Sequence, residues 1–146
     1  MIFKTGIAIA ACAFSALVLT GSASFAESMS VKADLQASSE TPPNTSKGTG
    51  ALTGTYDTST KVLTWSVTYT GLTGPATAAH FHAPAPVGKS AGVEIPIKGE
   101  LASPITGTAT LTDEQAKNLT DGMTYFNIHT AANKGGEVRG QVAVSK

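Results

Sequence analysis

The sequence predicts an all-β protein: an antiparallel Greek-key or immunoglobulin-like β-sandwich or barrel with one short helix. Past residue 26, Thr, Gly, Ala and Val dominate, and helical periodicity is nearly absent. Turn residues recur about every 8–12 positions, the spacing of short strands in an all-β domain. A segment of about 120 residues is long enough for one domain with its own core.

Residues 1–26 have the pattern of a secretory signal. Lys4 supplies a positive charge near the start, and Gly6–Leu19 carries no charge. Ser24 and Ala26 are the small residues at the −3 and −1 positions, so we expect cleavage after Ala26. The apolar run is shorter than the roughly 20 residues of a membrane span, although an uncleaved amphipathic anchor is the alternative. We therefore expect residues 27–146 to be delivered as a single periplasmic or secreted domain.

Composition excludes several functions for that domain. The single cysteine, Cys12, lies in the predicted signal, so the delivered domain has no thiol for disulfides, catalysis or Cys-type zinc sites. The ten basic and ten acidic residues of the chain are spread without runs. This argues against a nucleic-acid partner or a polybasic membrane contact. No second apolar stretch approaches the length of a membrane span.

The first half reads as three strands. Residues 29–37 alternate apolar and polar, and 38–47 must be a loop because it contains two adjacent prolines. Residues 50–56 and 61–70 flank a four-residue turn and predict a hairpin. In its second arm, Leu63, Trp65, Val67 and Tyr69 share one face.

The second half adds shorter elements. Strands are expected at 77–82, 93–97 and 107–111, with a Pro/Gly-rich loop at 83–92, and a last hairpin at 123–130 and 137–144. The helix begins after the N-cap Thr112 and ends at Gly122. The acidic pair Asp113-Glu114 is then read as part of the first helical turn.

All three histidines fall into two short segments. Because side chains alternate along a strand, His80 and His82 face one way and Phe81 the other. His129 lies opposite the apolar Phe126, with Asn127 and Tyr125, so all three imidazoles share one sheet face if the apolar sets share one core. His-x-His places two rings about 7 Å apart on one face, and a third from a neighbouring strand completes a three-nitrogen site suited to copper or zinc.

Other polar residues on this face are candidate additional ligands or supporting groups. A fourth ligand could be water, a carboxylate or a partner group, and Glu137 and Glu40 are the first carboxylates to consider. The competing interpretation is a metal-free hydrogen-bonded cluster that locks the sheet and loops together. Its members would be the three histidines with Asn127, Glu137, Arg139 and Gln141.

The chain resembles the CHRD (chordin) domain family, in its single-domain exported bacterial type. The resemblance rests on the segments Gly71–Pro75, Ala78–His82, Tyr125–Thr130 and Gly135–Gln141, in that order. It implies a Greek-key or immunoglobulin-like barrel and marks the three histidines, Asn127, Glu137, Arg139 and Gln141 as signature positions, without implying an activity. The His-x-His on such a barrel also resembles copper–zinc superoxide dismutase, but three histidines cannot build its dinuclear site.

Three functions follow as hypotheses. The first is binding of a single copper ion, or a zinc ion, by His80, His82 and His129. The second is a structural or protein-interaction module, whose partner would be another exported protein. The third is a mononuclear copper redox enzyme, such as a superoxide-dismuting protein. We rank metal binding first and catalysis last.

Overall fold

The computed structural model describes residues 27–146, and the predicted signal at 1–26 lies outside them. Among the described residues, no helix is long and apolar enough to span a membrane. The elements are, in order, β1 Ser28–Gln36, the 3-10 helix η1 Ala37–Ser39, β2 Thr49–Asp57, β3 Val62–Thr70, β4 Ala76–His82, β5 Val93–Pro96, β6 Ile105–Thr110, α1 Asp113–Thr120, β7 Tyr125–Thr130, β8 Val138–Gln141 and β9 Ala143–Ser145.

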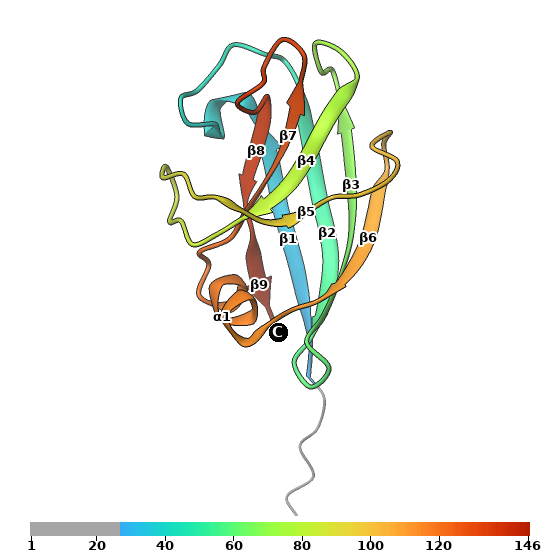
Figure 1. Cartoon of the computed structure of the whole chain (residues 1–146), viewed down its shortest axis with the longest axis vertical. Coiled ribbons are helices and arrows are strands. Elements are labelled where there is room, and N and C mark those ends of the chain that lie inside the picture. Colours follow the sequence, from blue (N-terminus) through green and yellow to red (C-terminus); the bar gives the residue numbers. More distant parts are fainter. Residues whose placement is uncertain (1–26) are drawn as a thin grey trace, which may run out of the picture.

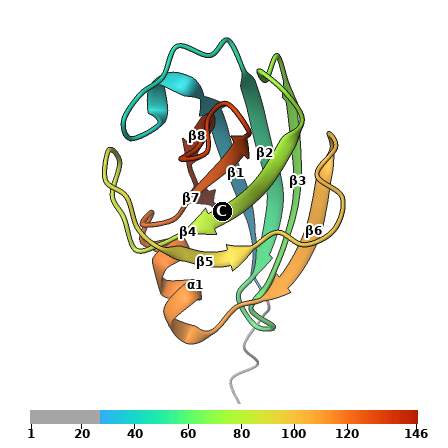
Figure 2. The same ribbon diagram turned by 45° about the horizontal axis from the view of Figure 1, so that its top comes forward.

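The strands form one curled antiparallel sheet, which confirms the all-β class with one short helix (Figures 1 and 2). Its order is β5-β4-β7-β8-β1-β2-β3-β6, with β9 paired beside β8 on β1. The curl brings β4 and β5 across from β2 and β3, and α1 closes the lower end (Figure 1). The expected hairpin of β2 and β3 is present, in register from Thr49↔Thr70 to Tyr56↔Leu63.

The last expected strand, 137–144, is two strands in the structure. β8 pairs with β7, whereas β9 pairs with the first half of β1. Between them, the Val142 backbone N–H turns to donate to the Thr124 carbonyl at 2.9 Å. The alternation of side chains continues through such a break, so the sequence pattern did not reveal it.

Helix α1 begins as predicted. The Thr112 side chain accepts from the Gln115 backbone N–H at 3.2 Å, and the Gln115 side chain accepts from the Thr112 backbone N–H at 2.9 Å. This capping box satisfies two N–H groups that the first helical turn leaves free. Gly122, with φ of +71°, follows the helix in the left-handed conformation.

Aromatic rings join the two sides of the curled sheet. Phe81 of β4 is fully buried, 5.2 Å from the Trp65 ring of β3 and 4.8 Å from the Phe126 ring of β7, both edge to face. Aliphatic residues from β1, β2 and β6 fill the remaining space, including Leu35, Leu52 and Ile105. The core therefore occupies the concave side of the sheet.

Two loops cover the opposite, convex face over β4, β7 and β8. The loop at 38–47 reaches Asn127 through Glu40, and the loop at 83–92 reaches His82 through the Ala91 carbonyl. Polar side chains that point away from the core are therefore buried as well, and Asn127 is only 2% exposed. The candidate site lies in this second, polar interior.

We predict that Gly107→Ala destabilises the fold. Gly107 pairs with Trp65 across β6 and β3, and an added Cβ would lie 2.4 Å from Cζ2 of the indole. Overpacking of this kind costs about 1–3 kcal/mol. The loss should appear in urea unfolding, with Gly74→Ala as the matched control because its Cβ would meet nothing within 4 Å. Equal stability of both variants would contradict the packing described for Trp65.

Candidate metal centre

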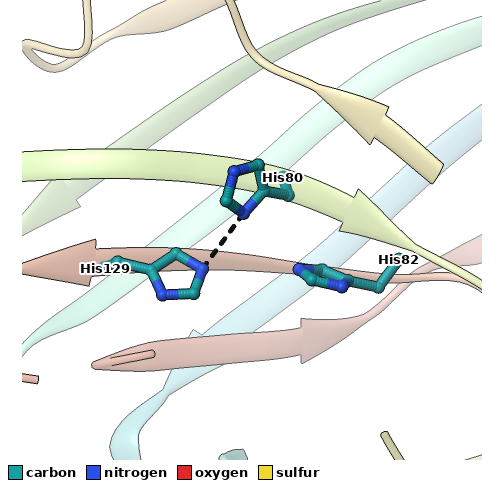
Figure 3. Close-up of side chains that lie close together, drawn as sticks. All are labelled: His80, His82 and His129. Atoms are coloured by element: carbon teal, nitrogen blue, oxygen red, sulfur yellow. Dashed lines mark hydrogen bonds between the residues drawn. The ribbon is translucent and has the colours of Figure 1, made fainter. Parts of the chain in front are cut away.

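The three histidines meet on the convex face as the alternation predicted. His80 and His82 come from β4 and His129 from β7, the next strand in the sheet (Figure 3). One nitrogen from each ring lies within 4.8 Å of the corresponding nitrogens of the other two. Nδ1 of His80 is 3.1 Å from Nε2 of His129, the contact dashed in Figure 3.

Backbone carbonyls set the tautomers of two of the rings. Nδ1 of His82 is 3.0 Å from the Ala91 oxygen, and Nδ1 of His129 is 2.9 Å from the Lys134 oxygen. A carbonyl oxygen only accepts hydrogen bonds, so both Nδ1 atoms must carry the proton. Each Nε2 of the neutral rings then has a lone pair, which in His129 can accept a hydrogen bond from Nδ1 of His80. A backbone or carboxylate acceptor on the second nitrogen is the usual setting of a metal-ligating histidine.

Asn127 turns its carbonyl oxygen to the same point. Its Oδ1 lies 3.0 Å from Nε2 of His82 and 3.0 Å from Nε2 of His129. Its Nδ2 donates to Oε1 of Glu40 at 3.2 Å, and this bond assigns the orientation of the amide. Glu40 is thereby part of the site through Asn127, without itself contacting an imidazole.

These contacts bring three acceptor atoms together: two imidazole lone pairs and one amide oxygen. With neutral rings no proton lies between them, and buried acceptors that face one another destabilise the site. A cation at their centre removes the conflict. Ligands about 2.0–2.1 Å from a tetrahedral ion are separated by about 3.3 Å, close to the 3.0 Å spacing of Asn127 Oδ1 from both rings.

His80 is the adaptable member of the set. It is only partly buried, and within residues 27–146 its Nε2 has no hydrogen-bond partner in the protein. His80 can therefore carry its proton on either nitrogen. With the proton on Nε2, the lone pair of its Nδ1 points towards His129 and the same centre.

His80 and His82 favour the uncharged form of the imidazole. Burial lowers the pKa of His80 below its ordinary value, and the nearby His129 and His82 rings lower it further. Burial also lowers the pKa of His82, and the hydrogen bonds to Ala91 and Asn127 oppose this only in part. Neutral imidazole is the form that binds a metal ion.

Glu137 does not join the histidines. It is fully buried at the end of the loop before β8, where its carboxylate accepts hydrogen bonds from the Thr73 backbone N–H and from four side chains. These donors are Ser46, Thr73, Thr130 and Asn133. Burial by itself would raise the pKa of Glu137, but the hydrogen bonds from Ser46, Thr130 and Thr73 hold that pKa at about 2. Glu137 ties two loops to β7.

Arg139 and Gln141 lie beside the site without contacting a histidine. Gln141 donates to the carbonyls of Ala85 and Gly122 at 2.9 and 2.8 Å, which fixes the loop at 83–92. The Arg139 guanidinium lies 3.4 Å from the centre of the Tyr125 ring. Tyr125 in turn stacks on His82, so one aromatic ring lies between Arg139 and the nearest imidazole.

Tyr125 is the residue of the site that sequence reasoning did not single out. Its ring stacks on His82 at 4.7 Å with an interplanar angle of 3°. His82 and Arg139 belong to β4 and β8, which flank β7, so they lie on opposite faces of the tyrosine. Alternation had placed Tyr125 on the histidine face, but not the stacking. The Ala91 and Lys134 carbonyls gave no signal, because every residue carries one.

The fold and the site define an all-β protein with a three-histidine cluster on the convex face of a curled sheet. The family model of the CHRD domain matches residues 31–142, and the chain belongs to that family. Comparison with curated proteins finds no match. Comparison with solved structures finds none either.

We predict that Glu137→Gln costs about 3 kcal/mol of unfolding free energy at pH 7, since the pKa of about 2 for Glu137 lies well below the ordinary value of 4.5 for a glutamate. A lowered carboxyl pKa stabilises the fold above pH 4.5, and this stabilisation is lost as the pH falls towards 2. The variant should therefore approach the wild type near pH 2–3. Urea unfolding at pH 7 and at pH 2–3 checks this, with Glu114→Gln, a substitution of an exposed glutamate, as the control. A loss of the same size at both pH values would contradict it.

Proposed function

We propose that this protein is exported and binds a single metal ion through His80, His82 and His129. The observation that supports this most directly is the convergence of the three rings, with ligand nitrogens within 4.8 Å of one another. The proton positions on His82 and His129 strengthen the proposal, because both rings present a lone pair to the shared centre. Export is proposed from the signal pattern of residues 1–26.

Copper is the first candidate ion and zinc the second. Imidazole suits both, and a site of nitrogen and oxygen donors binds Cu²⁺ more tightly than Zn²⁺. We assign the Oδ1 atom of Asn127 as the additional donor, because it lies 3.0 Å from two of the ring nitrogens. Glu40 would hold that oxygen in place by accepting the Asn127 N–H.

We propose binding rather than catalysis. A catalytic metal keeps one coordination position open for water or substrate, whereas a closed set of four ligands is typical of a structural site. Asn127 would occupy the fourth position here. A redox enzyme would need Asn127 to move away from the ion, and its Nδ2 is held by the buried Glu40 carboxylate.

A metal-free structural or interaction module is the second candidate. It is favoured by the direct hydrogen bond between His80 and His129, which lets part of the cluster hold together without an ion. In that case the histidines would stabilise the convex face and its loops, and a partner protein would bind there.

We expect protein purified aerobically, without chelator, to carry about one equivalent of copper or zinc by elemental analysis. The His80→Ala/His82→Ala variant should carry none, because one ring cannot hold the ion. His80→Gln, which changes only a partly exposed ring, is the milder variant for which folding is expected to survive. Absence of metal from the wild type, also after incubation with excess copper, would contradict metal binding and leave the structural module.

We also expect metal affinity to be constant between about pH 8 and 7 and to fall below about pH 6.5. The proton and the ion compete for the same lone pairs. Because burial lowers the pKa values of His80 and His82 beneath 6.5, the loss begins only on the acid side of that value. Competition titrations against a chelator of known affinity would measure it. Unchanged affinity from pH 8 to 5 would exclude imidazole ligation.

A further inference from the structure

A pocket of about 420 Å³ lies beside the candidate metal centre. Its lining includes Arg139 and Gln141 of β8, Thr41 and Pro43 of the loop at 38–47, and Val87 of the loop at 83–92. Neither the three histidines nor Tyr125 line it. Its volume falls within the range of about 300–1,000 Å³ that small-molecule sites have.

Arg139 brings a buried and incompletely paired positive charge to this pocket. Arg139 is 2% exposed, yet among residues 27–146 no ion pair includes it. Its guanidinium donates to the Lys89 carbonyl and, at 3.4 Å, to the Thr41 hydroxyl. A guanidinium has five N–H donors, so these two bonds leave N–H groups free to bind a ligand. The Tyr125 ring offsets part of the cost of burying the charge, but no carboxylate in the described part of the chain pairs with it.

We propose that this pocket binds a small organic carboxylate. The carboxylate would accept hydrogen bonds from the Arg139 guanidinium, the charge-assisted pairing for which arginine is best suited. The Thr41 hydroxyl lies on the same lining as a second donor. Pro43 and Val87 offer an apolar wall for a short hydrocarbon body.

Glu40 narrows the choice of ligand. It also lines the pocket, and its two oxygens accept from the Asn127 side chain and the Thr41 backbone N–H. The negative charge of Glu40 repels any anion, and it repels a doubly charged ligand more strongly than a singly charged one, so a single carboxylate is favoured over phosphate or a multiply charged acid. The same chemistry could come from a free acid or from the C-terminus of a peptide, which the experiment separates.

The proposal does not depend on metal binding. The Tyr125 ring separates Arg139 from His82, so the guanidinium and the imidazoles lie on opposite sides of it. A bound carboxylate would contact Arg139 without ligating an ion at the histidines. The two proposals can therefore fail independently.

Isothermal titration calorimetry with butanoate tests the site. The protein sample is residues 27–146, measured once without metal and once with one equivalent of copper. We expect saturable binding in both samples, at least about tenfold tighter than butan-1-ol, butylamine or inorganic phosphate. Acetyl-Gly-Val and its C-terminal amide form the peptide arm. Tighter binding of the free peptide than of butanoate would identify a peptide C-terminus, and the reverse a free acid.

Charge changes at the rim test the location without disturbing the core. Val87 is 79% exposed and Val93, which does not line the pocket, is 51% exposed. We expect Val87→Glu to weaken butanoate binding several-fold and Val87→Lys to strengthen it. Val93→Glu and Val93→Lys are the matched controls and should leave it unchanged. Arg139→Lys, which keeps the charge but loses the planar fork, should weaken binding further.

Three results would overturn the proposal. The first is that butanoate shows no saturable binding at concentrations up to about 10 mM. A buried charge-assisted contact should give a dissociation constant below that concentration. The second is equal effects of the Val87 and Val93 substitutions. The third is binding only in the copper-loaded sample, which would place the carboxylate on the metal. That last result would leave metal binding at the histidines intact.

Discussion

The packing of Phe81 between Trp65 and Phe126 is the constraint on which the rest of the structure depends. These three rings join the two sides of the curled sheet, and Phe81 is fully buried. Because side chains alternate along β4, placing Phe81 in the core forces His80 and His82 onto the convex face. A one-residue slip of this strand would bury the imidazoles among apolar groups. The aromatic core therefore sets the position of the candidate metal centre.

The convex face then forms a polar interior, and its two buried carboxylates have different roles. Glu137 collects donors from the segments around Ser46, Thr73 and Thr130, so it acts as an anchor for loops. Glu40 instead accepts from Asn127 and thereby turns an amide oxygen towards the histidines. Glu137 therefore stabilises the scaffold, while Glu40 determines that the oxygen of the Asn127 amide, and not its nitrogen, faces the histidines.

Tyr125 links the two sites that we propose. One face of its ring stacks on His82, and the other carries the Arg139 guanidinium. A cation over an aromatic ring is stabilised by the electron-rich face. This contact holds the Arg139 guanidinium beneath the loops at 38–47 and 83–92, to which it donates hydrogen bonds. The same ring limits the movement of His82. The proposed metal site and the proposed carboxylate site thus lie on either side of the Tyr125 ring, and no residue is a ligand in both.

The sequence by itself determined the all-β class, the capped helix, the CHRD family and the common face of the three histidines. Each of these follows from local patterns or motif order, since alternation decides which way a strand residue points. Only the tertiary structure decided which polar residues meet. Glu40 and Glu137 are both acidic and both come from loops, yet only Glu40 reaches Asn127, because loop paths depend on distant contacts. The sequence pattern also could not predict three further features: the break between β8 and β9 at Val142, the stacking of Tyr125 on His82, and the carbonyls that orient His82 and His129. Backbone groups are the same at every position, and only the fold determines which side chains they face.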